Sequence, residues 1–214
     1  MTHTTTSTST TTIAQQARAS FLFALPFAFL SVALVLVLDA LGVPAMVWLG
    51  IVLAATLFVC PVVELILRTP LPRVLQLHYI LFIILGPFAG SALHLYGAIE
   101  RWDTWVHFDS GVMLAWLGML AVRRAEERAG APLPAWFSLS VILAVPMAFA
   151  SAWELCEFAS DQIIGTTAQL GVEDIMTDTA AATLGGLLAV ALLVALRRPR
   201  TLAPQSLLDE LTRR

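Results

Sequence analysis

Long runs of apolar residues, separated by short polar stretches, dominate the pattern of this 214-residue chain. About 20 helical residues are needed to cross the roughly 30 Å hydrocarbon core of a bilayer. Six runs are long enough, and each is too apolar all round for a surface helix. Membrane-barrel strands would be shorter and would alternate. The runs predict helices near Ser20–Leu38, Pro44–Leu67, Val74–Gly97, Asp103–Val122, Trp136–Ala159 and Asp174–Leu196.

The predicted fold class is therefore all-α, a polytopic integral membrane protein built as a bundle of six transmembrane helices. Helices satisfy their backbone polar groups internally, as a bilayer requires. We expect the bundle to occupy residues 19–200, with its functional half at about residues 100–190. A Thr-rich, disordered tail is expected at residues 1–18, because its polar composition cannot form a core. A second tail is expected at residues 201–214.

The overall composition excludes several classes of function. The chain is 58% hydrophobic and 13% charged, whereas a soluble domain is about 45–50% apolar and about 25% charged. These values argue against a soluble enzyme, a nucleic-acid-binding protein and a disordered protein. We expect membrane lipids and no nucleic acid as partners. The sequence leaves open whether the chain forms a homo-oligomer. Cys60 and Cys156 lie in apolar runs, and we interpret them as small core residues.

The arginines predict the orientation of the bundle. All twelve basic residues are Arg, and eleven of them fall on one side of the six-helix arrangement, with Arg101 alone on the other. Because cytoplasmic segments are rich in Lys and Arg, both termini are expected in the cytoplasm. The eleven are Arg18, Arg68, Arg73, Arg123, Arg124, Arg128, Arg197, Arg198, Arg200, Arg213 and Arg214.

Acidic residues gather at the opposite, extracytoplasmic ends of the last three helices. Within each helix they are spaced three, four or seven residues apart, so they share one face. Charged groups at membrane depth are costly, which favours a position inside the bundle or in a wet cavity. The three stripes are Asp103 with His107, Glu154 with Glu157 and Asp161, and Asp174 with Asp178, and His94 is a further candidate.

Six carboxylates at one depth repel one another, so bound protons, a metal ion or water must compensate their charge. A histidine among carboxylates favours zinc, manganese or iron as a divalent cofactor. The predicted ligands are His107, Glu157, Asp174 and Asp178, with Glu154 as general base. Asp103, Arg101, Asp161 and His94 are predicted to bind substrate or support the ligands. The alternative is a solvated outer rim of acidic residues at helix ends.

Other polar residues within the helices suggest structural roles. Asp109 lies about 200° around the helix from His107, so we leave it out of the site and expect it to face another helix or to mark a distortion. Glu64 and Arg68 are four residues apart, which predicts a local salt bridge. His78 is interpreted as an interfacial anchor.

Three segments carry a family resemblance: WDTWVHFDSGVMLAW, AWELCEFASD and GVEDIMTDTAAATLGG. They resemble the uncharacterised bacterial inner-membrane family typified by YjdF, with its D-x-x-x-H-F-x-x-G, E-x-x-E and D-x-x-x-D stretches. The resemblance covers roughly the C-terminal half and implies an integral membrane fold without supplying an activity. The VanZ-like families are more distantly similar, but they often carry Asn where this chain has Ala182.

Three functions are compatible with these residues. The first is a metal-dependent hydrolase or transferase that acts on a lipid or lipid-linked head group. The second is a proton or cation transporter, although the last three helices show no matching polar groups in their inner halves. The third is a non-catalytic scaffold, in which the cluster holds three helices together.

Overall fold

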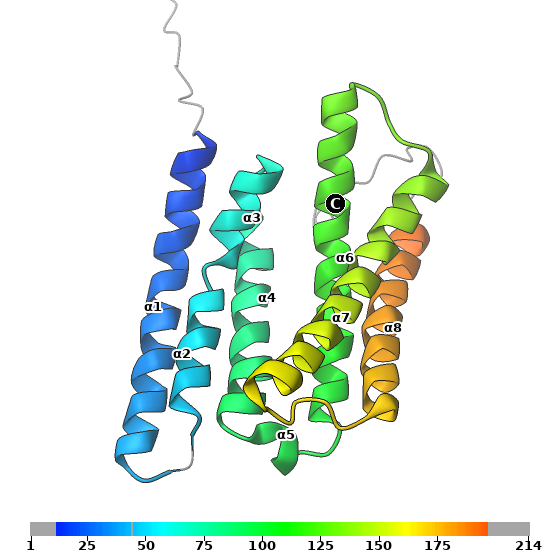
Figure 1. The fold of residues 1–214 in the computed structure, drawn as a ribbon. Coiled ribbons are helices and arrows are strands. Elements are labelled where there is room, and N and C mark those ends of the chain that lie inside the picture. The colour runs from blue at the N-terminus through cyan, green and yellow to red at the C-terminus, as the bar shows by residue number, and fades with distance from the viewer. Residues whose placement is uncertain (1–11, 44, 197–214) are drawn as a thin grey trace, which may run out of the picture.

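The computed structural model describes residues 12–43 and 45–196, and this part of the chain is helical without strands. The all-α prediction is therefore confirmed, and Figure 1 shows the helices as a bundle with alternating directions. The elements are α1 (Ile13–Ala40), α2 (Val47–Thr56), α3 (Val59–Leu67), α4 (Arg73–Ile83), the π-helix η1 (Ile84–Ala92), α5 (Leu95–Ala98), α6 (Trp102–Ala129), α7 (Ala135–Ile164) and α8 (Val172–Leu196).

Six spans in the described residues are long and apolar enough to cross a membrane, as predicted. Helices α2 and α3 together form one span, and α4 with η1 forms another. Large apolar side chains on the outside of the bundle are exposed, for example Phe29 at 71% and Ile66 at 71%. Lipid must cover such a surface, because water would make it strongly unfavourable.

The helices pack as two groups. Helices α1 to α4 and η1 contact one another, α6, α7 and α8 form a second group, and α4 and η1 contact α6 between the groups. We call the end of the bundle at which α6 and α8 begin the acidic end, after Asp103 and Asp174. The opposite end, which carries Arg18, Arg73 and Arg124, is called the arginine-rich end.

The first helix starts earlier than predicted. Residues 13–18, assigned above to the tail, are helical because Thr12 caps α1: its side chain accepts a hydrogen bond from the Gln15 backbone, and the Gln15 side chain accepts one from the Thr12 backbone. The expected tails at residues 1–11 and beyond residue 196 lie outside the described residues. Helix α6 continues past the predicted end at Val122 to Ala129.

Prolines interrupt two segments that the apolar pattern predicts as continuous helices. The break between α2 and α3 falls at Leu57 and Phe58, because Pro61 has no N–H for the carbonyl four residues earlier. The Tyr79 hydroxyl donates to the free Thr56 carbonyl at 2.8 Å. Pro87 likewise lies in η1, where the helix widens to the π form and ends at Ala92 rather than Gly97.

Helices α6 and α8 approach each other closely at two glycines. A Cβ atom on Gly111 would lie 1.9 Å from the Ala182 carbonyl oxygen, and one on Gly185 would lie 2.0 Å from the Phe108 carbonyl oxygen. Each glycine thus lets the backbone of the other helix occupy the place of a side chain. Small residues support such close packing in membranes, where dispersion contacts replace the hydrophobic effect between helices.

We predict that Gly111→Ala separates α6 from α8 and destabilises the protein. Overpacking costs about 1–3 kcal/mol, which corresponds to a fall of about 2–12 °C in Tm for a chain of this size. The measurement is thermal unfolding in detergent, followed by tryptophan fluorescence. Gly97→Ala is the control, because a Cβ there meets nothing within 4 Å. Equal Tm values for the two variants would contradict the close contact.

Candidate metal centre

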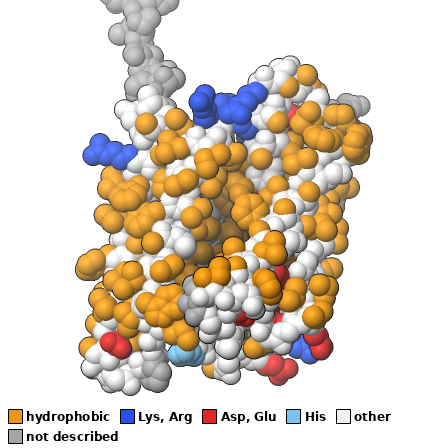
Figure 2. All heavy atoms as spheres, viewed as in Figure 1, with side chains coloured by type: hydrophobic (Ala, Val, Ile, Leu, Met, Phe, Trp, Pro, Cys, Tyr) orange, Lys and Arg blue, Asp and Glu red, His pale blue; other side chains and the backbone are white. Residues whose placement is uncertain are grey.

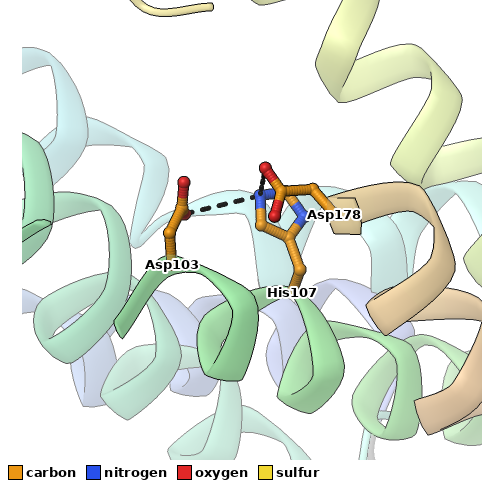
Figure 3. Close-up of side chains that lie close together, drawn as sticks. All are labelled: Asp103, His107 and Asp178. Carbon is orange, nitrogen blue, oxygen red and sulfur yellow. Dashed lines mark ion pairs between the residues drawn. The ribbon is translucent and has the colours of Figure 1, made fainter. Parts of the chain in front are cut away.

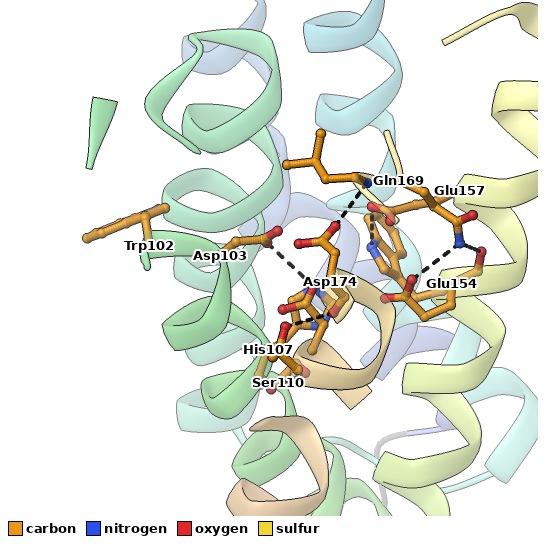
Figure 4. Close-up of polar contacts among 12 residues, drawn as sticks. Trp102, Asp103, His107, Ser110, Glu154, Glu157, Gln169 and Asp174 are labelled. Atoms are coloured by element: carbon orange, nitrogen blue, oxygen red, sulfur yellow. Dashed lines mark hydrogen bonds and ion pairs between the residues drawn. The ribbon is translucent and has the colours of Figure 1, made fainter. Parts of the chain in front are cut away.

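The start of α6, the end of α7 and the start of α8 meet at the acidic end of the bundle. Figure 4 shows Asp103 and His107 on α6, Glu154 and Glu157 on α7, and Asp174 on α8 directed toward one another. The structure therefore brings together the three polar stripes that helical spacing predicts. Asp103 and Asp174 lie in the first turns of their helices, where a carboxylate interacts favourably with the helix dipole.

His107 lies between two carboxylates from different helices (Figure 3). Its Nε2 atom is 3.5 Å from Oδ1 of Asp103, one turn earlier, and 3.7 Å from Oδ2 of Asp178 on α8. Each of the three offers a ligand atom within 4.8 Å of the other two. His107 is 8% exposed and Asp178 is 3% exposed. This buried imidazole with two carboxylates is the one group with metal-ligand spacing among the described residues.

The two glutamates of α7 differ in their partners. Glu157 accepts a hydrogen bond from the Trp153 indole at 2.9 Å. Glu154 is 6% exposed, and its Oε2 accepts from the Gln169 side chain at 3.4 Å, while its buried Oε1 has no hydrogen-bond partner in the described part of the chain. Both glutamates interact electrostatically with Asp103. Glu154 thus keeps one buried oxygen without a hydrogen-bond partner among the described residues.

The predicted ligand set and the observed group overlap in part. His107 and Asp178 belong to the three-residue group, whereas Glu157 and Asp174 do not, and Asp103, predicted in a supporting role, does. Asp174 accepts from the Leu170 backbone at 3.2 Å and interacts electrostatically with His107. Which of these residues bind a metal stays a prediction.

Three further candidates have other surroundings. Asp161 accepts hydrogen bonds from the Thr166 hydroxyl at 2.5 Å and from the backbone of Ala168 at 2.8 Å, so it organises the loop between α7 and α8. Arg101 is exposed and pairs with the exposed Glu100 at 3.6 Å. His94 is exposed, with a left-handed backbone at φ 62°. The structure does not bring these three into the Asp103–His107–Asp178 group.

Comparison with known proteins decides the family. The family model described as "Predicted membrane protein (DUF2238)" matches residues 22–199, which is most of the chain. This chain belongs to the DUF2238 family. The YjdF-like resemblance is confirmed, because that family corresponds to DUF2238. Searches of the curated proteins and of the solved structures gave no match. Membership of DUF2238 brings no established function.

Tyr96 is a member of the candidate site that the sequence did not reveal. Its ring packs against Gly90, where a Cβ would lie 2.3 Å from the ring, and its hydroxyl forms a hydrogen bond with Asp103. Burial raises the pKa of Tyr96 above its usual range, and the carboxylates of Asp103 and Glu157 raise it further. Its position could not be predicted, because the apolar pattern extends a helix through Tyr96, whereas the chain turns at His94.

Two predictions about polar residues outside the site have different outcomes. Glu64 makes no salt bridge with Arg68 in the described residues, so that prediction is wrong: it is buried and accepts from the Leu71 backbone at 2.9 Å, because the chain folds back after α3. Asp109 does face another helix, as expected, and its Oδ1 is 2.9 Å from Nε2 of His78 on α4. His78 therefore joins the two helix groups of this DUF2238 chain.

We predict that Tyr96 stays protonated in the folded protein well above pH 10, where a free phenol ionises. Because the folded-state pKa is raised, the neutral form stabilises the fold fully below about pH 10, and this contribution is lost as the pH rises through the raised pKa. The measurement is absorbance at 295 nm, as wild type minus Tyr96→Phe. A difference signal is expected only on unfolding. A midpoint near pH 10 in the folded protein would show that Tyr96 is accessible to water.

Proposed function

We propose that this membrane protein is a divalent-metal-dependent hydrolase or transferase that acts on lipid-linked head groups at the extracytoplasmic face. The observation that carries the proposal is the Asp103–His107–Asp178 group, whose ligand atoms lie within 4.8 Å of one another and in which His107 and Asp178 are buried. An imidazole with two carboxylates suits zinc, manganese or iron. Three protein ligands leave coordination positions open for water or substrate.

Electrostatics supports a cation at this position. Asp103 and Asp178 repel each other, and Glu154, Glu157 and Asp174 add to the negative charge around them. The nearest arginine in sequence, Arg101, is exposed and bound to Glu100. A divalent ion would offset this repulsion and would polarise a phosphoryl or acyl oxygen or acidify a bound water.

Glu154 is the best-supported general base. A base needs a free oxygen within reach of the proton that it removes, and Oε1 of Glu154 is buried without a hydrogen-bond partner in the described residues. Glu157 is less suited, since its side chain is only half-buried and its carboxylate accepts from the Trp153 indole. A lipid-linked substrate follows from the setting, because the cluster lies at the end of three helices with apolar outer faces.

The first test is the metal content of detergent-purified protein, measured by mass spectrometry after loading with zinc, manganese or iron. We expect about one ion per chain for wild type, and a loss of at least tenfold in His107→Ala and Asp178→Asn. Glu173→Gln is the matched control, an exposed carboxylate of the same helix end. A metal-free wild-type protein, or equal loss in the control, would overturn the metal site.

The catalytic part is tested separately on the same preparations. Glu154→Gln should keep the metal and lose most of the hydrolysis of lipid phosphates or lipid-linked phosphates in mixed micelles, by about 10²–10⁴-fold if it is the general base. Phosphate or head-group release is measured by chromatography. Unchanged turnover in Glu154→Gln would remove this glutamate from the reaction.

A second candidate function is proton or cation transport, favoured by polar contacts toward the arginine-rich end. Beyond the cluster, the His78–Asp109 pair links α4 with α6. Further on, the Gln76 side chain donates to Oε1 of Glu64 at 3.2 Å and accepts from Arg73 at 2.6 Å. The polar side chains that the inner halves of the last three helices lack are thus present on α3 and α4. Ionisable groups in such series form ion pathways in other membrane proteins.

Flux through reconstituted vesicles distinguishes the two candidates. If the protein is a transporter, a pH gradient across wild-type vesicles should collapse faster than in empty vesicles, and the double variant His78→Asn with Glu64→Gln should abolish the difference. A pH-sensitive dye inside the vesicles reports the rate, and Glu173→Gln serves as the control. Wild-type vesicles that behave as empty ones would exclude proton transport, and the same assay with a metal-sensitive dye would address cations.

A further inference from the structure

At the arginine-rich end, two arginines of α6 share one carbonyl oxygen at the end of α3. Leu67 is the last residue of α3, where a helix leaves its carbonyls without internal partners. Arg124 Nε donates to this oxygen at 3.3 Å, and Arg128 Nη2 donates to it at 3.4 Å. Both arginines lie on the part of α6 that continues past Val122. Two guanidinium groups therefore converge beside the end of α3.

The positive charge at this place exceeds the negative charge around it. Arg68, the next residue after Leu67, is exposed and has no side-chain partner among the described residues. Glu127 pairs with Arg124 at 3.2 Å. Oε1 of Glu126 accepts a hydrogen bond from the Leu133 backbone N–H at 2.9 Å. Figure 2 shows arginine side chains gathered over the gap between α3 and α6. Such an excess of guanidinium groups is suited to a phosphate.

An apolar hollow lies below these arginines. Figure 2 shows the surface hollowed between α4 and α7, with hydrophobic side chains along its border. The hollow has a structural cause, because α7 packs mainly on α6 and α8 and slants, so that its first turns lie away from the first helix group and only its last turns approach α4 (Figure 1). In a membrane, a space of this kind beside exposed apolar helices is filled by hydrocarbon chains.

We propose that this place binds a membrane phospholipid with an anionic head group, its phosphate at Arg68, Arg124 and Arg128 and an acyl chain in the hollow between α4 and α7. Charge complementarity selects the head group, since basic pockets between transmembrane helices bind anionic lipids. The hollow favours a lipid over a free phosphate, because only a lipid has an acyl chain that fills the hollow. The bound lipid joins α3 and α6 at the arginine-rich end. This proposal is independent of the metal centre at the other end.

The test is native mass spectrometry of delipidated protein titrated with phosphatidylglycerol or phosphatidylcholine of the same acyl chains. Wild type should bind phosphatidylglycerol at least tenfold more tightly. Each arginine near the phosphate contributes about fivefold in affinity. Arg128→Gln should therefore weaken phosphatidylglycerol binding about fivefold and leave phosphatidylcholine binding unchanged. Glycerol phosphate, which has no acyl chain, should bind at least tenfold more weakly than the lipid.

Arg18→Gln is the matched control, because Arg18 is an exposed arginine of α1 at the same end. It should bind phosphatidylglycerol as wild type does. Arg128→Lys keeps the charge and should retain most of the affinity, and elution from a sizing column shows that each variant is folded. Equal loss in Arg18→Gln, equal affinity for the two lipids, or glycerol phosphate binding as tightly as the lipid would each overturn the proposal.

Discussion

The close contact of α6 with α8 is the constraint on which the rest of the acidic end depends. His107 and Gly111 are four residues apart on α6, and Asp178 and Gly185 lie seven apart on α8, so the polar and the small residues share one interface. Without a side chain at either glycine, the two backbones approach until carbonyl oxygens occupy the missing positions. The same approach places the His107 ring 3.7 Å from Asp178. The packing of α6 on α8 and the contact between His107 and Asp178 therefore both depend on the close approach of these two helices.

This arrangement buries several ionisable groups where lipid surrounds the protein. A carboxylate facing hydrocarbon would cost at least about 2.5 kcal/mol, and the bundle avoids that cost by turning Glu154, Asp178 and His107 inward. Within residues 12–43 and 45–196, no arginine forms an ion pair with these carboxylates, and Arg101 pairs with Glu100 instead, which is the physical argument for a bound cation. The Tyr96 hydroxyl, held against Gly90, adds one neutral donor to the group.

Prolines and polar contacts decide how the first helix group meets the second. Pro61 and Pro87 each remove a backbone hydrogen bond, and the resulting break and π-helix shape α3 and η1. Three polar contacts then link the groups at successive depths: Trp102 to the Leu85 carbonyl, His78 to Asp109, and the arginines of α6 to Leu67. Between these contacts the two helix groups separate on the side of α7, and the hollow lies there.

The fold class, the six spans and the three polar stripes could all be predicted from the amino-acid sequence, because hydropathy and the helical repeat act within one segment. It could pair Asp103 with His107, which are one turn apart, but not His107 with Asp178, whose contact depends on two glycines 74 residues apart. Likewise, the position of Tyr96 depends on the turn at His94. The pairing of Asp109 with His78 depends on where α4 packs. These contacts depend on the packed bundle, because the depth and rotation of each helix follow from packing against its neighbours.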